Sequence, residues 1–190
     1  MERVQPIVLV GGRSVRFGRD KLREVVGHEG EREVLLVDRA IAALRAVFGA
    51  RVVLVGECDP LVAARGDAVL RDSHAGTGPV AGIVGALRLH EAIFVLPGDL
   101  PRVTEGVVRG VLAAAHRSPE AWAILAKADR LEPCIGVYRS AALGTLEERL
   151  ASRRLSLHDA LPDERVVGVE VDRACLANAN TPEDLGGIAG

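Results

Sequence analysis

The fold is decided by Val4–Lys21, VQPIVLVGGRSVRFGRDK, in which an apolar run passes directly into a polar, glycine-rich loop. Val4–Val10 is almost entirely apolar, which is typical of a central strand buried on both faces of a sheet. A second apolar strand, Ala92–Leu96, runs in the same way into a short loop, Pro97-Gly98-Asp99-Leu100-Pro101. In an open parallel sheet, ligands bind outside the carboxyl ends of the strands. The two loops therefore predict one ligand-binding site at the carboxyl ends of these two strands.

The rest of the chain alternates short apolar runs with segments of helical periodicity, and this alternation favours an α/β fold over an all-β fold. At about 100–200 residues per domain, the chain is expected to form a single domain spanning 1–190. Further strands are expected at 51–55, 68–70, 121–127, 134–138 and 166–171. Helices are expected at 34–47, 59–65, 80–90, 104–116, 141–152 and 181–185, with Asp59, Thr104 and Thr181 as N-cap residues and a turn at 27–30.

The composition argues against several classes of protein. There are 24 Lys and Arg against 26 Asp and Glu, so the formal net charge is −2, and aromatic residues make up 3%. Proteins that bind nucleic acids or membrane surfaces usually carry a strongly basic face, so neither partner is expected. No apolar run approaches the roughly 20 residues of a membrane helix, and the N-terminus lacks the pattern of a secretory signal. We expect a cytoplasmic protein whose cysteines are thiols, at Cys58, Cys134 and Cys175.

The first loop has the residues of a polyphosphate-binding loop. Gly11 and Gly12 allow a backbone to approach phosphate oxygens closely, and Arg16 and Lys21 supply charged donors. The loop is not a Walker motif, because Gly18 is followed by Arg-Asp-Lys, and it does not have the G-x-G-x-x-G spacing of dinucleotide-binding proteins. A solvated connection between strand and helix is the alternative interpretation.

Three further segments carry polar chemistry. Asp99 follows a buried strand, where a single carboxylate suits Mg²⁺ bound together with substrate phosphates, or else caps the helix at 104–116. Asp72 follows a predicted strand and precedes a small-residue loop that leads into a helix, whose N-terminus favours anions. Asn180 precedes Thr181-Pro182, which is typical of the start of a helix. Its amide either forms part of the turn or points into the site.

Together these four segments resemble the MobA-like nucleotidyltransferases, the molybdenum cofactor guanylyltransferase family. The resemblance rests on the loop from Leu9 to Lys21, the GPVAG of Gly78–Gly82, the Asp-x-Pro of Asp99, and the NTPEDL of Asn180–Leu185. It implies a Rossmann-like three-layer α/β sandwich with a mostly parallel mixed sheet. It also implies transfer of GMP from GTP to the terminal phosphate of molybdopterin, with Mg²⁺ as cofactor and pyrophosphate as product. Molybdoenzymes or cofactor-delivery proteins would be the protein partners.

The resemblance also assigns roles to residues. Lys21, Asp99 and Arg16 would be catalytic: Arg16 and Gly12 hold phosphates, Lys21 neutralises their charge, and Asp99 binds Mg²⁺. The second substrate would lie near Gly78, Pro79 and Asn180. The nucleotide would contact Leu9, Val10, Gly11, Gly12, Lys21, Asp72 and Asp99.

The sequence departs from the family pattern at three positions. Gly56 stands where Asn is common, Val10 where Ala is common, and Phe17 where Met is common. Since the Asn contacts a base or ribose, the departure at Gly56 bears on the choice between GTP and CTP. The alternatives are therefore a cytidylyltransferase or phosphosugar nucleotidyltransferase of the same fold, or a nucleotide-binding partner without catalysis.

Overall fold

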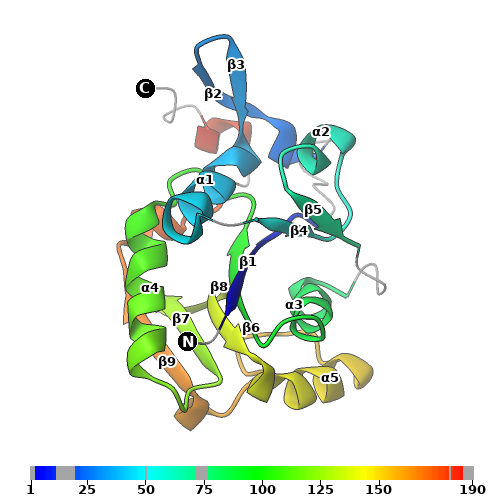
Figure 1. Cartoon of the computed structure of the whole chain (residues 1–190), viewed down its shortest axis with the longest axis vertical. Coiled ribbons are helices and arrows are strands. Elements are labelled where there is room, and N and C mark those ends of the chain that lie inside the picture. Colours follow the sequence, from blue (N-terminus) through cyan, green and yellow to red (C-terminus); the bar gives the residue numbers. More distant parts are fainter. Residues whose placement is uncertain (1–2, 12–19, 50, 72–76, 180, 186–190) are drawn as a thin grey trace.

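The structure is a computed structural model that describes residues 3–11, 20–49, 51–71, 77–179 and 181–185. Within these residues, seven strands form the main sheet in the order β5-β4-β1-β6-β8-β7-β9 (Figure 1). The strands β5, β4, β1 and β6 are parallel, β8 is antiparallel to both neighbours, and β7 is parallel to β9. The mostly parallel mixed sheet is confirmed. The strands are β1 (Val4–Leu9), β4 (Val53–Val55), β5 (Ala68–Leu70), β6 (Ala92–Pro97), β7 (Ala123–Lys127), β8 (Leu131–Arg139) and β9 (Val166–Glu170).

Helices cover both faces of this sheet, as expected of a three-layer sandwich (Figure 1). The α-helices are α1 (Leu36–Phe48), α2 (Pro60–Ala63), α3 (Pro79–Leu87), α4 (Glu105–Arg117) and α5 (Leu143–Ala151). Short 3-10 helices lie at η1 (Lys21–Arg23), η2 (Ser140–Ala142), η3 (Asp163–Arg165), η4 (Arg173–Leu176) and η5 (Pro182–Leu185). None of the helices among the described residues has the length and apolar character needed to cross a membrane.

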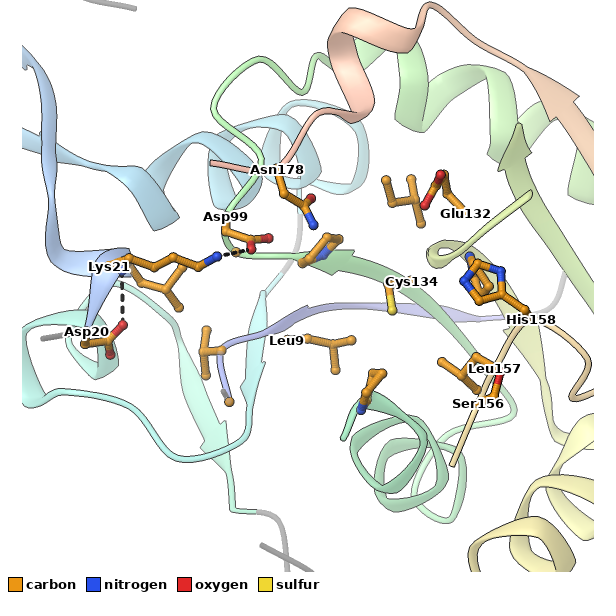
Figure 2. A pocket seen from close by; sticks show the side chains of 18 residues that line it. Leu9, Asp20, Lys21, Asp99, Glu132, Cys134, Ser156, Leu157, His158 and Asn178 are labelled. Atoms are coloured by element: carbon orange, nitrogen blue, oxygen red, sulfur yellow. Dashed lines mark hydrogen bonds and ion pairs between the residues drawn. The ribbon is translucent and has the colours of Figure 1, made fainter. Parts of the chain in front are cut away.

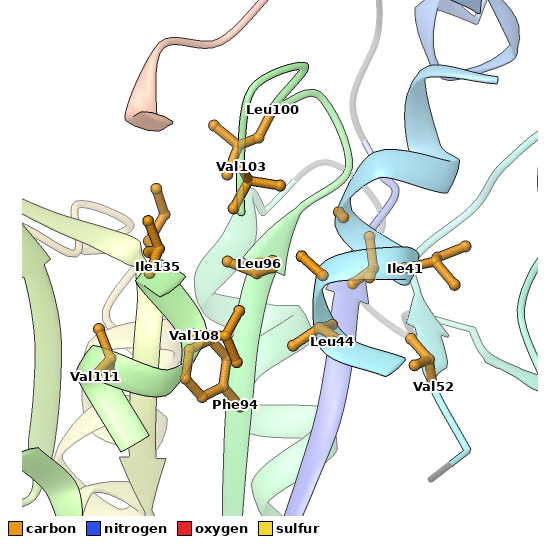
Figure 3. Packing of buried hydrophobic residues seen from close by; sticks show 14 of the residues in the cluster. Ile41, Leu44, Val52, Phe94, Leu96, Leu100, Val103, Val108, Val111 and Ile135 are labelled. Atoms are coloured by element: carbon orange, nitrogen blue, oxygen red, sulfur yellow. The ribbon is translucent and has the colours of Figure 1, made fainter. Parts of the chain in front are cut away.

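The central strand β6 shows how the sequence divides the core between the two faces. Successive side chains of a strand point to opposite faces. Phe94 and Leu96 accordingly pack with α1 and α4, as Figure 3 shows, whereas Ile93 and Val95 pack with α3 and α5. All four side chains are fully buried. Because both faces are covered, this strand contains no polar residue, and that is why a continuous apolar run identified it.

A small β-hairpin that the sequence analysis did not predict stands apart from the main sheet (Figure 1). Its strands are β2 (Val25–Glu29) and β3 (Arg32–Leu35), where a turn and the start of a helix were expected. The turn falls at Gly30, which has φ +63°, and α1 begins at Leu36 rather than at residue 34. The hairpin strands bury three side chains: Val26 and Val34 in a small cluster with Leu36 and Ala179, and Leu35 in the main core. The apolar pattern of the hairpin is therefore too short to recognise.

The predicted helix caps are partly right. Asp59 is the N-cap of α2 and accepts a hydrogen bond from the Leu61 N–H. Thr104 is the N-cap residue of α4, but its side chain makes no capping hydrogen bond. Thr181 directly precedes the 3-10 helix η5, at the expected place. The three cysteines are partly buried free thiols, as predicted.

Arg139 stabilises the far end of α4. Its guanidinium donates hydrogen bonds to the carbonyls of Ala115, Ser118 and Ala121, at 2.6–2.9 Å. The last carbonyls of a helix have no partner within the helix, and a cation suits the negative end of its dipole. Arg139 therefore connects β8 to the C-terminus of α4 and to the loop that leads into β7.

Candidate functional site

A pocket of about 430 Å³ opens at the carboxyl ends of β1 and β6 (Figure 2). Its position is the one predicted for a parallel sheet, where loops diverge from neighbouring strands. The wall combines the β1 and β6 ends, η1 and the start of α3 with β8, the loop after α5 and the segment before residue 180. It is lined by Leu9, Val10, Gly11, Asp20, Lys21, Leu22, Pro79, Pro97, Gly98, Asp99, Glu132, Pro133, Cys134, Ile135, Ser156, Leu157, His158 and Asn178.

Lys21 and Asp99, which are 78 positions apart in the sequence, meet at one end of this pocket (Figure 2). The Lys21 Nζ lies 2.6 Å from the Asp99 Oδ2 and 2.9 Å from the carbonyl oxygen of Ala179, to both of which it donates. The two side chains are only 19% and 14% exposed. The structure thus brings together the cation of the first loop and the carboxylate of the β6 loop.

Asp20 fixes the turn that carries this lysine. Its Oδ1 accepts from the Leu22 N–H at 3.0 Å, and its Oδ2 accepts from the Asp59 N–H at 3.2 Å. The first contact caps η1, and the second ties that short helix to the start of α2. Short polar side chains favour such local bonds to backbone N–H groups. Asp20 therefore positions Lys21 while remaining in the pocket wall.

The remaining oxygen of Asp99 has the properties of a ligand atom. Its Oδ1 is buried and has no hydrogen-bond partner among the described residues. The Asp99 main chain is held separately, because its carbonyl accepts from the Ala179 N–H at 2.9 Å. The carboxylate pairs with Lys21 and does not cap α4, so the capping alternative is wrong. Buried polar atoms normally have partners, and an unpartnered carboxylate oxygen fits Mg²⁺.

Clusters of three or more His, Cys, Asp or Glu side chains that could hold a metal do not occur among the described residues. This agrees with a Mg²⁺ site in which one or two carboxylates act together with substrate phosphates and water. Among the described carboxylates that line the pocket, Asp99 is the one with a buried oxygen that lacks a partner, and it stays the predicted Mg²⁺ ligand.

The end of β1 brings backbone to the pocket, as predicted for Leu9, Val10 and Gly11. The Leu9 carbonyl accepts from the Gly98 N–H, and the Val10 N–H donates to the Val55 carbonyl, both at 3.0 Å. Both bonds continue the sheet into the loop, so the backbone position of Gly11 is set by its two neighbouring strands.

Gly56, the departure from the family pattern, lies directly against Gly11. A Cβ atom at Gly56 would be 2.6 Å from the backbone nitrogen of Gly11 and 2.8 Å from its Cα. Gly56 also has φ +123°, a conformation that side chains rarely adopt. The chain therefore has a steric reason for glycine at this position, and an Asn would displace the loop.

The other predicted residues have different outcomes. Pro79 lines the pocket, but Gly78 does not, since it is the N-cap residue of α3 with φ +69°. Both residues were predicted to lie near the second substrate, and this placement stays a prediction. The predicted residues Gly12, Arg16, Asp72 and Asn180 lie outside the described residues.

Sequence reasoning missed the opposite end of the pocket. Glu132, Cys134, Ser156, Leu157 and His158 lie there (Figure 2). They come from β8 and from the loop after α5, which carry no recognisable motif. Burial, together with the negative charges of Asp99 and Glu132, raises the pKa of the Cys134 thiol to about 11. Cys134 is therefore a neutral wall residue at ordinary pH, not an activated nucleophile.

Comparison with known proteins identifies the family to which this chain belongs. Residues 6–164 match the family described as the MobA-like NTP transferase domain. The chain belongs to this family. As a MobA-like NTP transferase it is an enzyme of the nucleotidyltransferase class, which confirms the resemblance drawn from the four sequence segments.

Relatives of this NTP transferase match along almost the whole chain. A protein of Opitutus terrae named probable molybdenum cofactor guanylyltransferase is 34% identical over 93% of this chain and 90% of its own length. A Pseudomonas syringae protein named molybdenum cofactor guanylyltransferase is 28% identical over 96% of this chain and 92% of its own length.

Solved structures confirm the NTP transferase fold. Molybdopterin-guanine dinucleotide biosynthesis protein A of Archaeoglobus fulgidus superposes with a TM-score of 0.76 at 24% identity, covering 97% of this chain and 96% of that one. A 2-C-methyl-D-erythritol 4-phosphate cytidylyltransferase of Thermus thermophilus gives a TM-score of 0.62 at 18% identity, covering 99% and 97%. At these identities the likeness is one of fold.

Proposed function

We propose that the chain transfers GMP from GTP to the terminal phosphate of molybdopterin and releases pyrophosphate. The observation that carries the proposal is the pairing of Lys21 with Asp99 at the carboxyl ends of β1 and β6. The names of the relatives, which agree on a molybdenum cofactor guanylyltransferase, support the choice of GTP and of a molybdopterin acceptor. We further propose that 1–190 is one domain and that the enzyme works in the cytoplasm.

The reaction needs no general base from the protein. An oxygen of the acceptor phosphate attacks the α-phosphorus of GTP, and the bond from this phosphorus to the bridging oxygen of the β-phosphate breaks. Since a phosphate monoester is already anionic near pH 7, its oxygen does not have to lose a proton to become a nucleophile. Catalysis then consists mainly of positioning two anions and stabilising the charge that develops. Cys134, the thiol of the pocket wall, is neutral and takes no part in this step.

The residues of the pocket divide this work. Lys21 supplies a positive charge beside the end of the phosphate-binding loop, and its bond to the Ala179 carbonyl limits where that charge can lie. The backbone from Leu9 to Gly11 is held by the sheet and gives the triphosphate a fixed boundary. Asp99 would hold Mg²⁺, which supplies Lewis-acid stabilisation of phosphate charge. Arg16 and Gly12 complete the phosphate contacts in this proposal. Asp72 contacts the nucleotide, and Gly78, Pro79 and Asn180 lie near the acceptor.

The test is a panel of GTP, CTP, ATP and UTP with molybdopterin and Mg²⁺, scored by pyrophosphate release. We expect release with GTP and with molybdopterin present. Preference for CTP, transfer to a phosphosugar instead, or GTP binding without pyrophosphate release would each contradict the proposal. Lys21→Ala should lower kcat by roughly 10²–10³, the scale for losing one preorganised electrostatic donor, and Asp99→Ala should lower it strongly as well. Near-normal turnover in a folded Lys21→Ala protein would remove Lys21 from the mechanism.

A further inference from the structure

The pairing of β8 with β7 is interrupted beside the pocket. Leu125 of β7 is opposite Gly136, whereas the next residue, Ala126, is opposite Glu132. Residues 133–135 of β8 therefore leave the ladder as a bulge. Bulges next to active sites commonly redirect side chains, and here the residues from Glu132 to Ile135 all line the pocket.

Buried groups on both sides fix the shape of this bulge. Tyr138 is 1% exposed, and its hydroxyl donates a 2.7 Å hydrogen bond to the carbonyl of Pro133. At the other end, a Cβ atom at Gly136 would collide with the carbonyl oxygen of Ile124, so the strand passes this point only as glycine. The bulge is thus a rigid part of the wall, and the position of Glu132 is set by the fold.

The Glu132 carboxylate lines the pocket and is partly exposed. Its side chain is 32% exposed, and its Oε1 forms an ion pair with the Nε of the exposed Arg130 at 3.6 Å. That distance is too long for a hydrogen bond. Figure 2 shows Glu132 at the end of the pocket opposite Lys21, with His158 and Leu157 at the same end. A carboxylate here can accept two bonds from a ligand that lies along the pocket.

The order of the sheet separates this end from the region expected to hold the nucleotide. Leu9, Val10 and Gly11, which are predicted to contact the nucleotide through their backbone, lie at the end of β1, on the β5-β4-β1 side of the sheet. Glu132 belongs to β8, on the other side of β6. Asp99, at the end of β6, lies between the two sides, where the two phosphate groups must meet.

We propose that Glu132 recognises the pterin ring of the acceptor, accepting two parallel hydrogen bonds from its 2-amino-4-oxopyrimidine edge. This edge presents an amine N–H and a ring N–H side by side, and a carboxylate pairs with such a donor pair in the way it pairs with a guanidinium. Guanine carries the same edge, and the position of β8 in the sheet assigns Glu132 to the acceptor rather than to GTP. The inference rests on the proposed function, since that function supplies the pterin.

The binding test uses 6-carboxypterin and 6-carboxylumazine, in which an oxo group replaces the 2-amino group, titrated into the full chain and followed by pterin fluorescence. We expect the unsubstituted protein to bind the pterin about 10- to 100-fold more tightly, the range for charge-assisted hydrogen bonds. Glu132→Gln should abolish this preference and leave GTP affinity unchanged. Glu170→Gln, at an exposed position of β9, is the matched control and should retain the preference.

A second variant tests the bulge. Tyr138→Phe removes only the hydroxyl that holds Pro133, so it should weaken the pterin preference and raise the KM for the acceptor without changing GTP affinity or kcat to the same extent. If the pterin preference, the affinity for GTP and kcat all fall to the same extent, and the midpoint of thermal unfolding falls as well, Tyr138 has a structural role. That result would count against a role in positioning Glu132.

The outcomes separate this inference from the proposed function. An unchanged pterin preference in Glu132→Gln, or a fall in GTP affinity with unchanged pterin binding, would overturn the assignment of Glu132 even if GMP transfer occurs. A preference for the pterin that depends on Glu132 would support the assignment even if the unsubstituted protein fails to transfer GMP, and in that case only the proposed function would be wrong.

Discussion

Replacing Gly56 by Ala tests whether the loop after β1 is held by backbone packing. The added Cβ would lie 2.6 Å from the Gly11 nitrogen and 2.8 Å from its Cα. Because both atoms belong to the main chain, no change of side-chain rotamer can relieve the contact. The backbone of Gly56 has φ +123°, which alanine adopts only with strain.

The two effects can be given magnitudes. Forcing a side chain into this backbone conformation costs about 1–2 kcal/mol. Overpacking against neighbouring atoms costs about 1–3 kcal/mol. We therefore expect Gly56→Ala to lower the free energy of unfolding by about 2–5 kcal/mol in total. The relaxation that remains available is a shift of Gly11, so the affinity for GTP should fall as well.

Urea unfolding measures the change in stability, provided that the slope m is the same in both proteins. Titration of the folded variant with GTP measures the change in affinity. At an m of about 2 kcal/mol/M, the midpoint should fall by roughly 1–2.5 M. Gly110→Ala is the control, since Gly110 lies inside α4 with nothing within 4 Å of its added Cβ. That change should stabilise the protein by about 0.5–1 kcal/mol. A loss below about 1 kcal/mol in Gly56→Ala, with unchanged GTP affinity, would refute the reasoning.

Three further predictions concern ionisable side chains. Lys21→Met should cost about 2–3 kcal/mol of stability because the mostly buried Asp99 loses its cation, and adding Asp99→Leu should recover part of it; additive losses in urea unfolding would show that the pair is uncoupled. Arg139→Ala should cost about 2–3 kcal/mol, since three carbonyls lose their donor, whereas Arg88→Ala, in an exposed ion pair, should cost under about 1 kcal/mol by the same assay. Burial raises the pKa of Cys134 from 9.0 to about 11, so the folded state holds this proton where the unfolded state has lost it. The stabilisation from this thiol is therefore complete below pH 9 and should be lost by about pH 11, and Cys134→Ala should show a smaller decline in stability over that window; equal declines would contradict this.

The sequence predicted the parallel half of the sheet because burial on both faces leaves an unmistakable signal. In β1 and β6 almost every residue is apolar, so no register or partner had to be known. The hairpin of β2 and β3 gave no such signal, since it buries only Val26, Val34 and Leu35 and most of its other residues are polar or charged. It packs against Leu36 of α1, which follows it directly, and against Ala179, which is distant in the chain.

The candidate site was predictable at one end for a related reason. Asp99 closely follows the end of β6, and Lys21 closes the glycine-rich loop that follows β1, so the local sequence shows both the strand and the charge. Glu132 occupies its place through a bulge whose position depends on the register of β8 against β7, and His158 through the path of the loop after α5. Neither position is set by residues adjacent in the sequence, so the sequence alone does not predict that Glu132 and His158 line the pocket.

The bond from the Lys21 ammonium to the Ala179 carbonyl spans 158 positions and has a consequence for biosynthesis. On the ribosome, β1 and β6 emerge early and can associate while later codons are still being read. The lysine acquires its second acceptor only when residue 179 has left the exit tunnel. A nascent chain stalled before that point would carry β1 and β6 with an ammonium that lacks one of its two anchors.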